Sequence, residues 1–376
     1  MKCLVLLLGL ILCWPAPRFA SERAVVQPIM ADNASVATLL TKPSCLGTGD
    51  DPAGTCTVKD LNLPGSGVTI HGQLYLPSTE GKFPVVILVP GGFNETDLIM
   101  MAPRYYAPRF ASCGFAAYVF YKRGTGPSGG IYADATYDDF IDDVVSIAEA
   151  LAKQPNIDTT RIGLQGGSSG ALIAAVAAAR SSRIAFVIGC SGPIVSWEEE
   201  TNYNMEHALL SRGFPDSLVQ MVMPLWRRYN AAWAHSDTAA QEAIAAEIHE
   251  LKGRYDPAVL PAPYHEFVTD SSFAFMWPRW RSAQRDYLSE LKHLKAKWLC
   301  IYGENDDRVP VSSCVRTIKA LTKESGSLDC TIVMLPGVDH SFVDPRTGSQ
   351  VPVIRIMVNW LTESGASNQR PRSGPE

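Results

Sequence analysis

Apolar runs of strand length alternate with helix-patterned segments along most of the chain. Almost wholly apolar runs are typical of strands buried on both faces of a parallel sheet. These runs span residues 83–89, 115–121, 161–164, 184–189, 297–302 and 330–335. Residues 105–113 and 137–151 instead place apolar side chains at helical spacing, and Val68–Tyr75 alternates as an early antiparallel strand does. The order predicts an α/β class fold with a mostly parallel central sheet flanked by helices.

The alternation stops between residues 195 and 295, where the pattern is mainly helical. We therefore predict a core formed by residues 67–194 and 296–363 with a helical insertion between them. Residues 25–66 are rich in Gly, Asp, Pro and Thr and predict an irregular N-terminal arm, and the polar residues 364–376 predict a disordered tail. The insertion holds five of the eight tryptophans and several methionines, whose side chains either line a pocket or form the insertion's own core. These are Trp197, Trp226, Trp233, Trp277, Trp280, Met205, Met221, Met223 and Met276.

The first residues have the pattern of an export signal. Lys2 precedes an apolar run over residues 3–13, which is too short to span a bilayer comfortably and is followed by polar sequence. We therefore predict a cleaved signal peptide over residues 1–24 and export to the periplasm or the extracellular space. No later segment approaches transmembrane length, so we expect no integral membrane segment after signal removal.

One serine lies in a glycine-spaced motif, Gly166-x-Ser168-x-Gly170, between an apolar run and an alanine-rich helical run. A strand that turns sharply into a helix needs glycine on both sides of the turn, because backbone segments pass there without room for a β-carbon. The turn would present Ser168 at the positive end of the following helix, where an oxyanion can be stabilised. The motif predicts a nucleophilic serine.

Two later loops supply an acid and a base in the order that such a serine needs. The strand run 297–302 leads into Gly-Glu-Asn-Asp-Asp-Arg-Val-Pro, which contains Asp306, and the run 330–335 leads into a loop with His340. His340 is the only histidine in the last 80 residues. A serine hydroxyl is a weak nucleophile, so His340 would take its proton while the carboxylate orients the imidazole.

This arrangement resembles the α/β-hydrolase superfamily, and within it the serine aminopeptidase-like and dienelactone hydrolase-like esterase and peptidase branches. Their acid loop reads Gly-x-x-Asp-x-x-Val-Pro, which aligns on Asp306 and leaves Asp307 as its neighbour. The resemblance implies the α/β-hydrolase fold, with a mainly helical cap at residues 195–295. It also implies that the cap's apolar side roofs the active site.

The oxyanion hole should use two backbone N–H groups. One follows the nucleophile, at Ser169. The other is expected in the loop Pro90-Gly91-Gly92-Phe93, which resembles the family's His-Gly-x loop with proline in place of histidine. We assign this donor to Phe93 or Gly92, with Phe93 preferred by the usual count.

Three further features have structural as well as functional interpretations. Arg123 lies in a loop that resembles the family's Asp-x-Arg-Gly-x-Gly-x-Ser loop, and we expect it to brace that loop. The aspartates at positions 138, 139, 142 and 143 predict a solvated helix face rather than a metal site. The glutamates at 198–200 either attract a substrate amine, as in aminopeptidases, or form a solvated helix start.

Composition narrows the range of partners. The net charge is −5, charged residues make up 19% of the chain, and no basic stripe interleaves with aromatic residues. Nucleic acid and anionic membrane surfaces are therefore not favoured as partners. The sequence has no Cys-x-x-Cys and no His-Glu-x-x-His motif, so we expect neither a metal nor another cofactor.

Export would place the cysteines in an oxidising compartment. Seven remain beyond the signal: Cys45, Cys56, Cys113, Cys190, Cys300, Cys314 and Cys330. Cys45 and Cys56 flank a Gly/Asp/Pro loop, which makes a bridge between them one possibility. Cys190 and Cys300 lie in apolar runs and are expected to be small core residues.

The sequence thus predicts an exported serine hydrolase that cleaves small carboxylic esters through an acyl-enzyme. One alternative is an aminopeptidase-like serine peptidase acting on the amide bonds of short peptides, and another is a non-catalytic binding protein on the same fold. The oligomeric state is not readable from the sequence.

Overall fold

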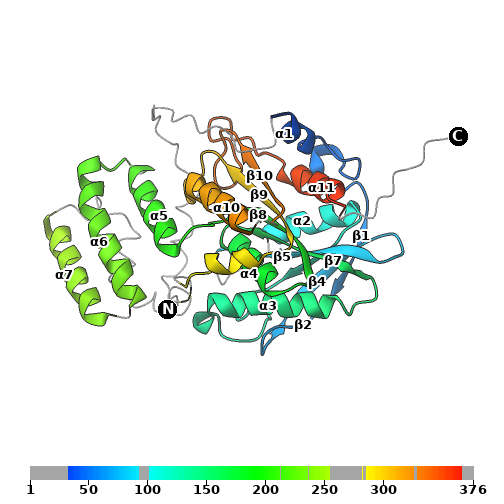
Figure 1. Cartoon of the computed structure of the whole chain (residues 1–376), viewed down its shortest axis with the longest axis horizontal. Helices are drawn as coiled ribbons and strands as arrows, with labels where there is room; N and C mark the ends of the chain where they lie inside the picture. Colours follow the sequence, from blue (N-terminus) through cyan, green and yellow to red (C-terminus); the bar gives the residue numbers. More distant parts are fainter. Residues whose placement is uncertain are drawn as a thin grey trace, which may run out of the picture.

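The computed structural model describes residues 33–92, 101–211, 213–235, 237–254, 282, 285–325 and 328–365. Its centre is an eight-stranded sheet with the order β1-β4-β6-β5-β7-β8-β9-β10 (Figure 1). The strands are β1 Cys56–Asp60, β4 Gly72–Pro77, β5 Phe83–Val89, β6 Ala116–Phe120, β7 Ile157–Gly167, β8 Ile184–Cys190, β9 Lys297–Gly303 and β10 Cys330–Leu335. The pairs β1·β4 and β4·β6 are antiparallel and the other pairs are parallel, as predicted. A two-stranded sheet, β2 Leu63–Pro64 with β3 Thr69–Ile70, lies apart from it.

Helices cover both faces of the sheet. Successive residues of β5 are all buried and alternate between two hydrophobic clusters: Val85 and Ile87 pack in one, Val86 and Leu88 in the other. The first cluster also contains α3, α4 and α10, and the second contains α1, α2 and α11. The helices are α1 Asn33–Leu39, α2 Met101–Ser112, α3 Tyr137–Leu151, α4 Ser169–Arg180, α10 Val311–Ser325 and α11 Val353–Glu363. This layering explains why the strand runs are apolar throughout.

The insertion is helical where the structure describes it. It contains α5 Trp197–Ser211, α6 Asp216–Ala234 and α7 Thr238–Arg254, at the left end of Figure 1. These helices share a hydrophobic cluster of their own, which includes Met205, Met223 and Trp226. Those three side chains therefore form the insertion's core rather than an apolar roof. The described part of the chain does not include the Trp233 side chain, Met276, Trp277 or Trp280.

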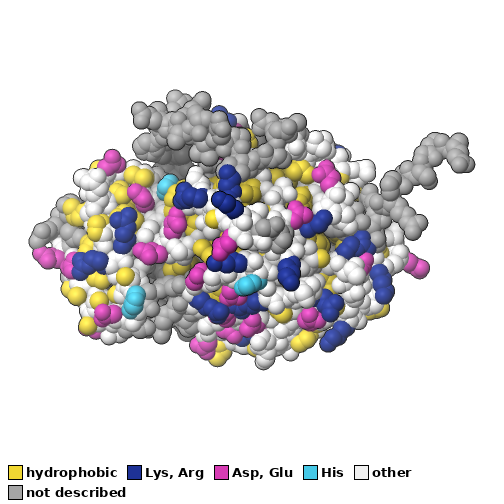
Figure 2. Space-filling view, in the orientation of Figure 1, with side chains coloured by type: hydrophobic (Ala, Val, Ile, Leu, Met, Phe, Trp, Pro, Cys, Tyr) yellow, Lys and Arg dark blue, Asp and Glu magenta, His cyan; other side chains and the backbone are white. Residues whose placement is uncertain are grey.

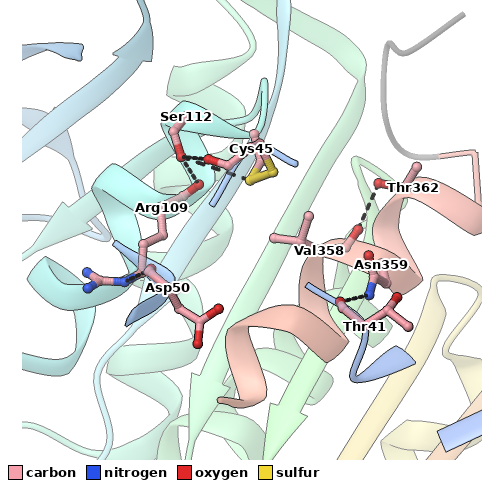
Figure 3. Close-up of a disulfide and its surroundings, with 9 residues drawn as sticks. Thr41, Cys45, Asp50, Arg109, Ser112, Val358, Asn359 and Thr362 are labelled. Atoms are coloured by element: carbon pink, nitrogen blue, oxygen red, sulfur yellow. Dashed lines mark hydrogen bonds between the residues drawn. A yellow bond between two sulfur atoms is a disulfide. The ribbon is translucent and has the colours of Figure 1, made fainter. Parts of the chain in front are cut away.

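The predicted irregular arm is wrong for three segments, because residues 33–39 form α1, residues 56–60 form β1 and residues 63–64 form β2. β1 pairs with β4 along its whole length and lies at the edge of the sheet. Arg355 binds the Asp50 carboxylate, with its Nε 2.7 Å from Oδ1. Figure 3 shows the second contact of Asp50, in which Arg109 Nε donates to the Asp50 carbonyl at 2.9 Å. The arm is thus docked on α2 and α11.

The proposed bridge between Cys45 and Cys56 is also wrong. Cys45 is bonded to Cys113, which directly follows α2 (Figure 3). The Ser112 hydroxyl donates to the Cys45 carbonyl at 3.1 Å, which places this part of the arm against the end of α2. Cys56 instead begins β1, opposite Pro77, and is a free cysteine.

Among the described helices, none combines the length and the apolar character needed to cross a membrane. On the face that Figure 2 shows, basic and acidic side chains are interspersed.

Candidate active site

Ser168 lies at the junction between β7 and α4. Its φ of 53° and ψ of −132° are outside the regions that non-glycine residues normally adopt, so the backbone is strained there. The Ser168 N–H donates to the carbonyl of Cys190 at the end of β8, at 2.8 Å. This is the sharp strand-to-helix turn that the glycine-spaced motif predicts.

The flanking glycines are required sterically. A β-carbon on Gly166 would lie 2.2 Å from the Gly170 carbonyl oxygen, and one on Gly170 would lie 2.5 Å from the Val89 carbonyl oxygen. Neither position can accept a side chain without moving the backbone. The expectation that the turn needs both glycines is confirmed.

Asp306 and His340 form a direct pair. His340 Nδ1 is 2.9 Å from each carboxylate oxygen of Asp306. The Asp306 side chain is fully buried, and its Oδ1 accepts the N–H groups of Arg308 and Val309 at 2.9 Å each. Asp307 is exposed, so Asp306 is the residue of this loop that meets the imidazole. The N–H groups of its own loop thus fix the Asp306 carboxylate in the position from which it orients His340.

Ser191 connects the histidine loop to the nucleophile turn. Its hydroxyl donates to the His340 carbonyl at 2.9 Å, and its N–H donates to the Ile301 carbonyl at 2.8 Å. The preceding residue, Cys190, accepts the N–H of Ser168. Two successive residues at the end of β8 therefore hold Ser168 and His340 at the same edge of the sheet. Sequence reasoning missed Ser191, whose one signal is its place directly after a buried strand.

The loop after β5 lies directly against the nucleophile turn. A β-carbon on Gly91 would lie 2.2 Å from the Gly167 carbonyl oxygen and 3.4 Å from the β-carbon of Ser168. The Gly92 N–H donates to the Ser169 hydroxyl at 3.0 Å, so this predicted oxyanion donor already has an acceptor. Ser169 is the first residue of α4, and a helix offers no backbone acceptor to its first N–H groups. Phe93 lies outside the described residues.

Comparison with known proteins identifies the family. Residues 66–341 match the family described as X-Pro dipeptidyl-peptidase (S15 family). The chain belongs to this family.

The relatives of this S15-family chain include enzymes of several kinds. It is 26% identical over 225 residues to polyketide transferase claH of Penicillium crustosum, covering 58% of the chain and 71% of that protein. It is 31% identical over 144 residues to esterase FrsA of Escherichia coli O81 (strain ED1a), covering 38% of the chain but only 33% of that esterase.

A solved structure, alpha/beta hydrolase GrgF from Penicillium sp. sh18, matches 82% of the chain and 98% of its own, with 14% identity and a TM-score of 0.53. This likeness shows the α/β-hydrolase fold. With the family match, it makes the chain a hydrolase of the serine esterase and peptidase kind. The alternative of a non-catalytic binding protein is therefore not favoured.

In this S15-family hydrolase, Arg123 braces its loop as expected. Its guanidinium binds both carboxylate oxygens of Asp143 at 2.7 and 2.8 Å, and it also contacts Asp139 at 2.8 Å. Asp143 is buried, so the prediction of a solvated helix face is wrong for this residue. Asp143 forms an ion pair with Arg123, which lies outside the helix. Helical spacing alone does not reveal such a partner. Among the described residues, no cluster of side chains suited to a metal ion occurs.

A cavity of about 630 Å³ lies between α5 and the start of α10 and reaches Asp306. Ser168 and His340 are not among the described residues that line it. Four glutamates do so, namely Glu198, Glu199, Glu206 and Glu304. The lining is therefore strongly acidic. This is not the apolar pocket that the sequence predicted under the cap.

Glu200, on α5, differs from its two neighbours. Glu198 and Glu199 are exposed, as a solvated helix start requires, whereas Glu200 is not. Burial raises the pKa of Glu200 to about 8, and the nearby Asp306 carboxylate adds to the shift. Glu200 is therefore mostly protonated at neutral pH.

Proposed function

We propose that this chain is an exported serine hydrolase that cleaves carboxylic esters through a covalent acyl-enzyme on Ser168. One observation carries the proposal. His340 Nδ1 lies 2.9 Å from the buried Asp306 carboxylate, and both loops lie at the edge of the sheet where Ser168 occupies a strained turn. An acid here orients a base at the same sheet edge as a serine at a helix N-terminus, and this arrangement supports a nucleophilic mechanism.

The reaction follows from these positions. His340 Nε2 removes the hydroxyl proton of Ser168 as the oxygen attacks the ester carbonyl, and Asp306 stabilises the imidazolium that forms. The negative charge on the carbonyl oxygen is stabilised by the N–H of Ser169 and by the predicted second donor at Phe93. The alcohol leaves with the proton from His340. Water, activated by the same imidazole, then hydrolyses the acyl-enzyme.

Export is part of the proposal and has two supports. The first is the apolar run of signal-peptide length over residues 3–13. The second is the disulfide between Cys45 and Cys113, since such bonds persist in oxidising compartments and are rare in the cytosol.

A serine peptidase acting on short peptides is the second candidate, and one observation favours it. The cavity beside Asp306 is lined by four glutamates, and such a lining would attract the positively charged amine of a peptide. The same three residues, Ser168, His340 and Asp306, would then act on an amide bond.

A substrate panel on the purified mature protein separates the two candidates. We expect turnover of p-nitrophenyl esters of short acyl chains to exceed turnover of aminoacyl and dipeptidyl anilides. Ser168→Ala should abolish both turnover and labelling by a fluorophosphonate probe. Labelling that persists at another serine would refute the proposed nucleophile, and faster cleavage of the anilides would favour the peptidase.

A further inference from the structure

Lys122 is a buried lysine whose side chain reaches the loop beside the nucleophile. It follows β6, and only 4% of its surface is exposed. Its Nζ donates to the Gly91 carbonyl at 3.0 Å and to the Gly92 carbonyl at 2.7 Å. It also lies 5.4 Å from the centre of the Phe140 ring, a distance at which a cation is attracted to an aromatic face.

One peptide group of this loop is held at both of its polar ends. Lys122 Nζ binds the oxygen of the Gly91–Gly92 peptide, and the Ser169 hydroxyl accepts the N–H of the same peptide at 3.0 Å. A planar peptide with both ends bonded cannot rotate without breaking one of the bonds. Since Ser169 directly follows Ser168, the orientation of this peptide is fixed relative to the nucleophile turn.

The described part of this loop, residues 90–92, has no polar side chain of its own with which to fix its conformation. Pro90 has no side-chain donor, and Gly92 has a φ of +70° and no side chain. Glycine has wide conformational freedom, so two consecutive glycines leave the loop free to take other conformations unless its polar groups are bound. The carbonyl that Lys122 binds most closely belongs to Gly92, directly before the position at which the sequence predicts the second oxyanion donor.

We infer that Lys122 is a positioning residue for the oxyanion loop, which it holds against the Ser168 turn by binding two successive glycine carbonyls. The inference rests on the proposed function, because it gives the loop a role in the reaction of Ser168. An alternative is that Lys122 only stabilises the fold. The two differ in what the loss of Nζ changes: a positioning role lowers kcat at constant KM, while a purely structural role lowers stability alone.

The test compares Lys122→Met with wild type and with Lys42→Met. Methionine keeps an unbranched side chain but removes the donors. Lys42 is a matched control, since its Nζ also donates to a carbonyl, that of Gly47 at 3.0 Å, but at an exposed position in the arm. We measure kcat and KM for the best ester of the panel, the rate of fluorophosphonate labelling at Ser168, and the thermal unfolding midpoint.

We expect Lys122→Met to lower kcat and the labelling rate by about 100-fold, comparable to the loss of one oxyanion donor, with KM changed less than about threefold. Lys42→Met should leave kcat, KM and the labelling rate at wild-type values. If Lys122→Met does not fold, Lys122→Gln replaces it, because the amide retains N–H donors. If both variants fold, kcat of Lys122→Gln should fall less than kcat of Lys122→Met. If only Lys122→Gln folds, its kcat should be about tenfold below that of wild type.

Three outcomes overturn the inference. The first is a folded Lys122→Met with wild-type kcat and labelling rate, while Ser168→Ala is inactive. The second is failure of both Lys122 variants to fold, which assigns the lysine to stability alone. The third is a wild-type protein not labelled at Ser168, and this result refutes the proposed function as well, so the two failures are distinguishable.

Discussion

The disulfide between Cys45 and Cys113 gives a prediction that can be worked from the structure. The two cysteines are 68 residues apart, and the bond joins the arm to the end of α2 (Figure 3). The perturbation is the double substitution of Cys45→Ser with Cys113→Ser. Other contacts keep the arm docked in the folded state, among them the bonds from Asn359 Nδ2 to the carbonyls of Leu39 and Thr41 at 2.9 and 2.8 Å. The main effect is therefore expected in the unfolded chain.

The magnitude follows from the entropy of closing a loop of that length. For a separation of 68 residues, the chain-entropy relation gives about 4 kcal/mol at 25 °C. A chain of 376 residues has an unfolding entropy of about 0.8 kcal/mol/K at the average value per residue. The thermal midpoint of the double variant should accordingly fall by about 5 °C.

The assay is thermal and urea unfolding in non-reducing buffer, with Cys56→Ser as the control. Cys56 is a free, half-buried cysteine of β1, so its replacement should shift the midpoint by less than about 1 °C. A digest without reductant should contain the peptides of Cys45 and Cys113 joined. Finding them separate, or a double variant as stable as wild type, would refute the reasoning.

Three more predictions concern single side chains. Gly91→Ala puts a methyl group 2.2 Å from the Gly167 carbonyl oxygen and should lower kcat about 100-fold in a folded protein, and an unchanged kcat would contradict the steric argument. Glu200 has a pKa of about 8 in the folded state and an ordinary pKa of 4.5. Below about pH 4.5 the protonated side chain costs the folded state nothing, and the free energy of unfolding then decreases as the pH rises through 8. The urea midpoint of wild type minus that of Glu200→Gln should therefore decrease as the pH is raised from 5 to 9. A difference that stays constant over this range would show that the pKa is not raised. Arg123→Met leaves the buried Asp143 carboxylate unpaired and should cost about 3 to 5 kcal/mol in urea unfolding, whereas a loss below about 1 kcal/mol would show that the pair does not hold the loop.

The parallel strands of the core were predictable because they are buried on both faces. Every residue of β5 is apolar and buried, so the run itself marks the strand. β1 was not predictable on this basis, since four of its five residues are exposed and its position depends on pairing with β4. The partner of Cys45 was hidden for a similar reason, because the arm meets α2 only in the folded structure.

In the candidate site, the sequence predicted the residues that directly follow the carboxyl ends of strands. Asp306 and His340 follow two parallel strands that are neighbours in the sheet, and these strands bring their carboxyl ends to one edge. Lys122 was missed because a charged residue in a Gly-rich turn has the pattern of a solvated loop. Its burial is set by the loop after β5 and by Phe140, which are distant in sequence.

Five parallel strands each contribute one part at the same edge of the sheet. β5 leads into the glycine loop, β7 into Ser168, β8 into Ser191, β9 into Asp306 and β10 into His340. Backbone groups take part in the bonds that hold the glycine loop to Ser169 and Ser191 to the loop of His340, whereas His340 with Asp306 and Gln165 with Cys190 are pairs of side chains. Because backbone groups do not distinguish one acyl chain from another, we expect the choice of substrate to come mainly from side chains outside this edge. The insertion between β8 and β9 supplies three of the four glutamates of the cavity, so substituting them should change substrate preference, while substitutions at the sheet edge should change the rate for every substrate alike.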